Sequence, residues 1–321
     1  HAVIQEQVQF KNLALAIIDE QHRFGVAQRL ALRGKMAEEG VEPHLLMMSA
    51  TPIPRTLTLA QYGEMDVSRL DELPPGRQAI DTRVVAVERM GDVVGALSRH
   101  IAGGGQAYWV CPMVRELETE DIAAAEARFA GLRERFGDRV VLVHGQLRPE
   151  VKDAGMERFA RGEAAVLVAT TVIEVGVDVP NATLMVIEQA ERFGLAQLHQ
   201  LRGRVGRGAA QSTCLLLRGP DLSETARQRL ALMRETQDGF RLAEEDLKLR
   251  GGGELLGTRQ SGTPGFAIAS LEAHGDLLEI ARKDAHYLLD RDPELESPRG
   301  KAIRKGREGK PSRPFSLGLA G

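Results

Sequence analysis

The sequence predicts an α/β protein with two parallel-sheet units followed by a helical C-terminal region. Short aliphatic segments alternate with amphipathic helical segments over most of the chain, and polar side chains directly follow several of the aliphatic segments. Beyond residue 222 the pattern changes to long, charge-rich helices. Strands that alternate with helices indicate βαβ units, and hence a parallel sheet covered by helices on both faces.

The first unit, residues 1–72, contains two predicted strands, Leu13–Ile18 and Leu45–Met48. Both are uninterrupted apolar runs, which is the pattern of a strand buried on both faces. Two strands cannot bury a core comparable to that of a complete doubly wound domain. We therefore expect this unit to be incomplete, and the chain to be the C-terminal portion of a longer protein.

A stretch rich in proline and glycine at residues 73–78 breaks regular structure, and we interpret it as a linker. The second unit, residues 79–222, contains helical patterns at Glu126–Arg135 and Pro149–Arg161. Its five predicted strands are Ala107–Cys111, Val140–Val143, Ala165–Ala169, Leu184–Ile187 and Thr213–Leu217. This alternation predicts a complete parallel-sheet lobe.

The C-terminal region, residues 223–321, contains two predicted helices, Ser223–Arg250 and Asp276–Asp290, joined by a glycine-rich connector at Gly251–Gly265. The end of the chain is locally basic although the whole chain is not. We interpret this run as a solvated, mobile tail in preference to an arm that contacts phosphates. Its cationic residues are Arg299, Lys301, Arg304, Lys305, Arg307, Lys310 and Arg313.

The bulk composition excludes several classes of protein. The net charge of −3 means that a nucleic-acid site would have to be a local basic surface. The two cysteines, Cys111 and Cys214, are too far apart in sequence for a metal clip and fit a reducing cytosol. No apolar run approaches the roughly 20 residues of a membrane span. We expect a cytoplasmic protein that does not enter a membrane.

The most informative segment is Asp19-Glu20-Gln21-His22, which ends the first aliphatic strand. In an open α/β sheet, ligands bind at the carboxyl ends of the strands. Two adjacent carboxylates there are costly to hold together unless a cation or a reacting water uses them. In nucleotide hydrolases the first acid of such a pair holds Mg²⁺ and the second can activate water. The alternative is a strand that ends in a solvated acidic turn.

Two further strands also end in hydroxyl side chains. Ser49 and Thr51 follow the second strand in the sequence Ser-Ala-Thr-Pro, where the simpler interpretation is a proline turn. Thr170 and Thr171 begin a run that continues to Asp178 and could contact a phosphate. In that run Gly176 permits a close backbone approach, and Asp178 could hold a ribose hydroxyl or an arginine.

The segment Gln200–Gly208 places Arg204 and Arg207 three residues apart between glycines. On a helix two residues at this spacing share a face. Two guanidinium groups on one face suit a polyphosphate that carries charge on several oxygens. The alternative is an exposed basic helix terminus.

These segments occur in the order of motifs II, III, V and VI of the superfamily 2 helicases. Within that group, the chain resembles the RecG family of bacterial ATP-dependent branch-migration helicases. The transcription-repair coupling factors share the downstream module, but they typically carry a different residue pair after the two acids. The resemblance rests on Asp19–Val26, Ser49–Leu57, His144-Gly145, Thr170–Asp178, Gln200–Arg207, Asp246–Gly251 and Gln260–Gly262.

The resemblance implies tandem RecA-like lobes, the first one partial, followed by a helical translocation module with a hairpin and a hook. It implies ATP and Mg²⁺ as cofactors, with Asp19 as the metal ligand and Glu20 positioning or deprotonating the attacking water. Arg204 and Arg207 would reach the γ-phosphate across the cleft between the lobes, and Gln200 would line that cleft.

The remaining implied roles concern coupling between nucleotide and DNA. Residues implied to couple the nucleotide site to the second lobe are Gln21, His22, Ser49 and Thr51. Residues implied to contact DNA or to assist coupling are His144, Thr170 and Thr171. The segment from Asp246 to Gly262, with Arg250 and Gln260, resembles the translocation motif. Gly252 stands where that family often places proline.

The implied function is an ATP-dependent double-stranded DNA translocase that remodels forks and Holliday junctions in recombination and repair, acting as a monomer. Single-strand DNA-binding protein is the implied protein partner. The sequence contains no Gly-x-x-x-x-Gly-Lys-Ser/Thr phosphate loop, so we expect the chain alone to hydrolyse ATP negligibly. Two alternatives remain open at this point: a non-catalytic DNA-binding or interaction module, and an RNA helicase that shares the two-lobed engine.

Overall fold

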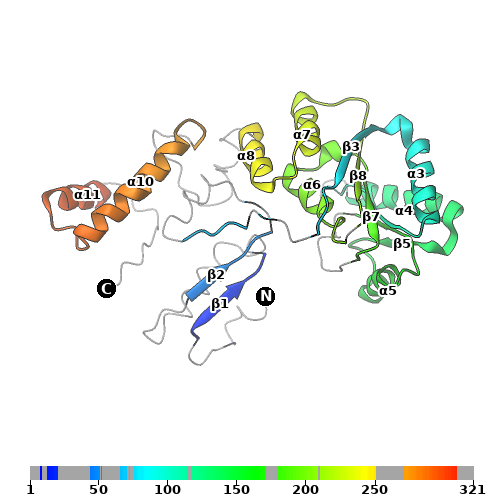
Figure 1. The fold of residues 1–321 in the computed structure, drawn as a ribbon, viewed down its shortest axis with the longest axis horizontal. Helices are drawn as coiled ribbons and strands as arrows, with labels where there is room; N and C mark the ends of the chain where they lie inside the picture. Colours follow the sequence, from blue (N-terminus) through cyan, green and yellow to red (C-terminus); the bar gives the residue numbers. More distant parts are fainter. Residues whose placement is uncertain are drawn as a thin grey trace.

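The computed structural model describes residues 8, 13–20, 44–50, 52, 66–70, 72, 76–113, 118–170, 179–208, 210–250 and 271–308. Two sheets are present in these parts of the chain (Figure 1). The first pairs β1 (Leu15–Ile18) with β2 (His44–Met47) in parallel. The second has six parallel strands in the order β3-β8-β7-β4-β6-β5. The six strands are β3 (Asp81–Ala86), β4 (Gln106–Val110), β5 (Val140–Val143), β6 (Val166–Ala169), β7 (Ala182–Ile187) and β8 (Thr213–Arg218).

The prediction of five strands in the second unit was therefore one short. The missed strand, β3, is one of the two edge strands of the sheet and pairs only with β8 among the described strands. Its sequence, Asp-Thr-Arg-Val-Val-Ala, is half polar and only Thr82 in it is buried. The strand at the other edge, β5, is a continuous and mostly buried apolar run, whereas β3 mixes polar with apolar residues and so lacks that signal.

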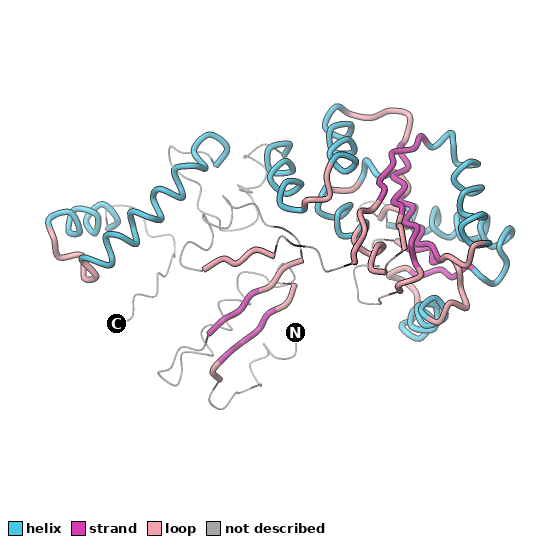
Figure 2. Tube along the Cα trace, viewed as in Figure 1, coloured by secondary structure: helices cyan, strands magenta, loops and turns pink. Residues whose placement is uncertain are grey.

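Helices cover both faces of the six-stranded sheet, as the tube view shows (Figure 2). On one face, α3 (Met90–Ala102) and α4 (Glu118–Phe136) pack with Trp109, Val168 and Val186. The opposite face is covered by α5 (Pro149–Ala160), α6 (Leu195–Arg202), α7 (Glu224–Glu235) and α8 (Gly239–Arg250). This is the layered α/β/α arrangement that the alternation of strands and helices predicted.

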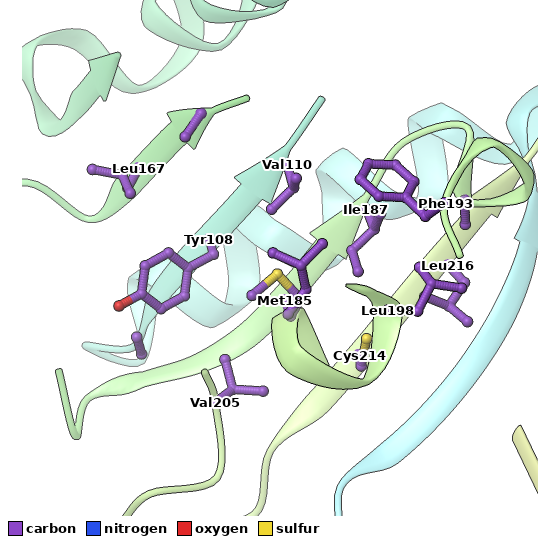
Figure 3. Packing of buried hydrophobic residues seen from close by; sticks show 14 of the residues in the cluster. Tyr108, Val110, Leu167, Met185, Ile187, Phe193, Leu198, Val205, Cys214 and Leu216 are labelled. Atoms are coloured by element: carbon purple, nitrogen blue, oxygen red, sulfur yellow. The ribbon is translucent and has the colours of Figure 1, made fainter. Parts of the chain in front are cut away.

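The core on the α6 face is shown in Figure 3, where apolar side chains of the strands meet those of α6 and its flanking segments. Tyr108 and Met185 from the sheet, and Leu198 from α6, are each at most 1% exposed. Val205, three residues after the end of α6, also joins this cluster. Burial of Val205 anchors the chain between Arg204 and Arg207.

The C-terminal region differs from the prediction in two ways. The expected single helix over Ser223–Arg250 is two helices, α7 and α8, because Thr236–Asp238 is non-helical. The expected mobile basic tail is in part helical: α10 (Leu271–Arg291) is followed by α11 (Pro298–Glu308), which carries the exposed cations Arg299, Lys301, Arg304 and Lys305. Lys310, Arg313 and the connector at Gly251–Gly265 lie outside the described residues. Within those residues, no helix combines the length and the apolar character that crossing a bilayer requires.

Candidate nucleotide site and its coupling contacts

The acidic pair lies at the carboxyl end of β1, beside the carboxyl end of β2. The amide of Met48 donates to the carbonyl of Ile18 at 2.7 Å, and continuing the pairing of Ile18 with Met47 sets Met48 opposite Asp19 and Ser49 opposite Glu20. The Asp19 side chain is exposed and its Oδ1 accepts the Glu20 amide at 2.7 Å. Asp19, Glu20 and Ser49 therefore follow the carboxyl ends of the two paired strands at the same edge of this sheet.

Glu20 has a left-handed backbone conformation, with φ of 50°. This conformation costs a non-glycine residue roughly 1–3 kcal/mol, and such strain is concentrated at functional sites. The bond from its amide to the Asp19 carboxylate holds the turn in place. Two carboxylates and a hydroxyl are hard oxygen ligands, and Mg²⁺ in nucleotide sites typically takes only one or two carboxylates besides the phosphates. The donor set present here fits that ion.

Arg204 and Arg207 do not share a helix face, and that prediction was wrong. Helix α6 ends at Arg202, and the chain turns so that the Arg204 amide donates to the carbonyl of Leu201 at 3.0 Å. Gly206 then has φ of 76°, which reverses the chain before Arg207. We call residues 203–207 the arginine loop. Gly203 is the residue at which the helix ends, and Gly206 supplies the left-handed conformation that follows.

The arginine loop lies at the amino edge of the six-stranded sheet. Gly206 packs against Ile80, which directly precedes β3, and a Cβ added at Gly206 would come within 2.9 Å of the Ile80 Cγ1. The side chain of Arg77, from the segment that leads out of the first unit, donates to the carbonyl of Gly203 at 3.5 Å. The loop is thus beside the linker, on the side of the lobe where the first unit is attached.

One contact joins the acidic edge of the first unit to α6. At Gly239, the first residue of α8, an added Cβ would lie 2.5 Å from Pro52 Cγ and 2.8 Å from His199 Nε2. Pro52 follows Ser49 by three residues, and His199 directly precedes Gln200. The segment after β2 and the helix that leads to the arginine loop therefore meet at Gly239. Nearby, the Arg69 guanidinium stacks over the Phe240 ring at 4.7 Å.

His199 is held neutral in this contact. Burial and, to a smaller extent, the adjacent Arg202 charge lower its pKa from the ordinary value of 6.5 to about 4. Its Nδ1 lies 3.1 Å from Arg202 Nη2 and accepts that guanidinium hydrogen bond. A proton on His199 would remove this acceptor and place a second cation beside Arg202.

The opposite, carboxyl edge of the sheet carries other polar groups. His144 and Thr170 follow β5 and β6 and are 3% and 0% exposed. Within the described part of the chain, neither ring nitrogen of His144 nor the Thr170 hydroxyl has a hydrogen-bond partner, and the nearest carboxylate to His144 is Glu126, at 3.7 Å. Both were predicted to contact DNA or to assist coupling. Neither side chain is open to a DNA strand in this structure.

Sequence reasoning missed a charged network at the same edge. Glu188 directly follows β7 and accepts from Trp109 Nε1 at 2.5 Å and from Arg128 at 2.5 and 3.0 Å. The pKa of Arg128 is raised, mainly by its hydrogen bond to Glu188. Alongside, Arg192 forms a bidentate pair with Asp121 at 2.9 and 3.1 Å. Glu188 could have been found from the sequence, because it is an acid that directly follows an apolar strand, the same pattern that pointed to Asp19.

Two other predicted site residues, Arg250 and Gln200, lie in the described helices. Arg250 ends α8, but its side chain is not described. Gln200 lies in α6 and is partly buried. The predicted residues outside the described parts of the chain are Gln21, His22, Thr51, Thr171, Gly176, Asp178 and Gln260. The two cysteines are free and buried, and burial raises the pKa of both thiols, that of Cys214 to about 12.

Two family models match the chain. Residues 88–209 match the helicase conserved C-terminal domain, and residues 236–308 match the C-terminal part of domain 3 of the ATP-dependent DNA helicase RecG. Among curated proteins, the RecG helicase of Escherichia coli O157:H7 is 52% identical over 297 residues, covering 92% of this chain and 43% of that protein. The RecG helicase of Bacillus subtilis is 47% identical, with 95% and 44% covered. The chain thus spans less than half the length of these relatives.

Solved structures agree with the sequence comparisons. A structure of RecG bound to a three-way DNA junction superimposes with a TM-score of 0.66 at 46% identity, covering 87% of this chain and 35% of that one. The DUF1998 helicase MrfA, bound to DNA and AMPPNP, gives a TM-score of 0.54 at 15% identity, covering 85% and 40%. The second likeness is evidence for the fold alone.

Proposed function

Because this chain corresponds to the C-terminal portion of the RecG family of ATP-dependent DNA helicases, we propose that it supplies half of a motor that remodels branched double-stranded DNA. In this proposal residues 1–72 are the end of the first helicase lobe, 73–78 the linker, 79–222 the second lobe, and 223–321 a translocation module. The substrates are stalled forks and Holliday junctions, and the complete protein works in the cytoplasm as a monomer. Single-strand DNA-binding protein is its proposed protein partner.

The observation that carries the proposal is the meeting of Pro52, His199 and Gly239. It places the segment that follows the acidic edge of the first unit against the helix that leads to the arginine loop. Carboxylates from one unit and guanidinium groups from the other can then act on one triphosphate, which is the arrangement a nucleotide-driven motor requires. A module that only binds DNA has no use for the acidic pair.

In the proposed mechanism, Asp19 binds Mg²⁺ and Glu20 orients the attacking water or accepts its proton. The bound ion would neutralise charge on the triphosphate. Arg204 and Arg207 stabilise the negative charge of the transferring phosphoryl group, a contribution worth roughly 10³–10⁵ in rate where it has been measured. Because the arginine loop lies beside the linker, closure of the two lobes would bring these guanidinium groups to the γ-phosphate.

Coupling to DNA is assigned to the groups at the other edge and to the C-terminal helices. We propose that the buried His144 and Thr170 couple movements of the sheet edge to bound DNA, with Thr171, Gly176 and Asp178 in the adjoining segment. The segment around Arg250 and Gln260 would convert lobe closure into movement along the duplex. The residues of the first lobe proposed to sense the nucleotide are Gln21, His22, Ser49 and Thr51. In the second lobe, Gln200 is proposed to do so.

The test is Glu20→Gln in the full-length protein, compared with Glu134→Gln, which changes an exposed carboxylate on α4. DNA-stimulated ATP hydrolysis should be abolished by Glu20→Gln and retained by the control, while Mg-ATP still binds to both. The proposal fails if the unaltered protein shows neither Mg-ATP affinity nor hydrolysis. That outcome would favour the alternative of a non-catalytic DNA-binding module.

A further inference from the structure

The non-helical connector between α7 and α8, residues Thr236–Asp238, is tied to both ends of the arginine loop. At the first end, Arg202 is 2% exposed although it is charged, and it has no carboxylate partner within the described residues. Its Nη1 donates to the carbonyls of Met233 at 2.7 Å and Thr236 at 2.9 Å. A buried guanidinium is costly unless its donors are satisfied, so this arrangement fixes the connector to the residue that precedes the loop.

At the second end, the side-chain amide of Gln237 pairs with the backbone of Ile80. The Ile80 amide donates to Gln237 Oε1, and Gln237 Nε2 donates to the Ile80 carbonyl, both at 3.1 Å. Ile80 is the residue against which Gly206 packs. The connector therefore contacts Ile80, and Ile80 in turn packs against Gly206 in the arginine loop.

The connector is held by its own hydrogen bonds and leads directly into the contact with the first unit. The Asp238 amide donates to Thr236 Oγ1 at 3.1 Å, and Asp238 Oδ1 accepts the Phe240 amide at 2.8 Å, which caps the start of α8. Gly239 and Phe240 follow at once and contact Pro52 and Arg69. Residues 236–240 thus contact Arg202, which precedes the arginine loop, Ile80, against which Gly206 packs, and the first unit.

We propose that Arg202 and Gln237 are positioning residues that fix the arginine loop to this connector, so that Arg204 and Arg207 reach the nucleotide only while α7 and α8 are docked. The inference rests on the proposed function, because it assigns the arginines to the triphosphate. It implies that the C-terminal helices control hydrolysis as well as respond to it. Small displacements are enough, since a 1 Å misplacement of a catalytic group can cost about 100-fold in rate.

The test uses Gln237→Ala and Arg202→Lys in the full-length protein. Gln228→Ala is the matched control, because Gln228 is an exposed residue of α7 whose amide only bonds Glu224 on the same helix. We expect Gln237→Ala to lower the kcat of DNA-stimulated ATP hydrolysis about 10- to 100-fold, with the KM for ATP changed by less than about twofold and Tm unchanged. Arg202→Lys should lower kcat in the same way, because one ammonium group cannot span the acceptors of the guanidinium.

The inference is overturned if Gln237→Ala hydrolyses ATP like Gln228→Ala, or if only Arg202→Lys loses activity and its Tm falls in parallel. An unaltered protein without ATPase activity would contradict the proposed function instead. A second measurement does not depend on ATPase activity. In the 321-residue chain, hydrogen exchange of the arginine loop, residues 203–207, should be faster in Gln237→Ala than in Gln228→Ala, and equal rates would overturn the inference.

Discussion

Replacing Gly206 by alanine should destabilise the second lobe by two separable effects. Gly206 has φ of 76°, and an added Cβ would lie 2.9 Å from Ile80 Cγ1 and 3.2 Å from Ile80 Cδ1. The left-handed conformation costs alanine about 1–2 kcal/mol. Overpacking against a buried isoleucine costs a further ~1–3 kcal/mol. We therefore expect the free energy of unfolding to fall by about 2–5 kcal/mol.

A matched variant separates the two effects. Gly162 has nearly the same conformation, with φ of 77°, but no atom lies within 4 Å of its added Cβ. Gly162→Ala should therefore cost only the backbone contribution, about 1–2 kcal/mol. Urea unfolding of the 321-residue chain can be followed by the fluorescence of Trp109, which is the one tryptophan in the sequence and is fully buried. The difference between the two variants measures the contact with Ile80.

Equal destabilisation of the two variants would refute this reasoning. It would mean that Ile80 does not press on the arginine loop, or that it moves away without cost. If the difference is found, Gly206→Ala in the full-length protein should also lower the kcat of ATP hydrolysis more than Gly162→Ala, since Gly206 lies between Arg204 and Arg207.

Three further predictions concern the charged groups and the chain as a whole. Arg128→Ala should destabilise the second lobe by about 3–5 kcal/mol in urea unfolding, because it leaves the 15%-exposed Glu188 carboxylate without its cation. Its control, Arg133→Ala, removes an exposed ion pair and should cost less than about 1 kcal/mol. Similar losses for both variants would contradict the role assigned to the network. The folded pKa of His199 is about 4, below its ordinary 6.5, so the stability that neutral His199 contributes is complete above pH 6.5 and is lost as pH falls toward 4. This loss should amount to up to about 3 kcal/mol of the free energy of unfolding. An identical acid transition in His199→Asn would disprove this. The 321-residue chain should hydrolyse ATP negligibly with or without DNA, since the sequence lacks the phosphate loop that cradles the triphosphate, and robust DNA-stimulated turnover would contradict that expectation.

The parts of the fold that were predictable are those set by local pattern. Strands such as β4 and β7 are continuous apolar runs buried on both faces, and the prediction of their positions was confirmed. Edge strand β3 was not predictable in this way because its burial depends on a neighbour, β8, far along the chain. The break between α7 and α8 was missed because Thr236–Asp238 contains no proline or glycine and is held non-helical by long-range bonds from Arg202 and Gln237.

The candidate site shows the same division. The acidic pair was found from sequence because polar residues directly follow an uninterrupted apolar run, a purely local signal. The expectation that this strand is buried on both faces was wrong, since only Ile18 in β1 is buried. The arginine pair was found, but its geometry was wrong, since a three-residue spacing was interpreted as helical although Gly203 and Gly206 end the helix there. Networks such as that of Glu188 with Trp109 join residues 79 positions apart, and no local pattern reports such pairing.

The most direct test is a structure of the full-length protein with Mg²⁺ and a non-hydrolysable ATP analogue. The account predicts that the carboxylates of Asp19 and Glu20 and the guanidinium groups of Arg204 and Arg207 surround the same triphosphate, with the arginine loop still bound to Thr236–Asp238. A structure in which the nucleotide is bound between the lobes while both arginines point away from it would contradict the account.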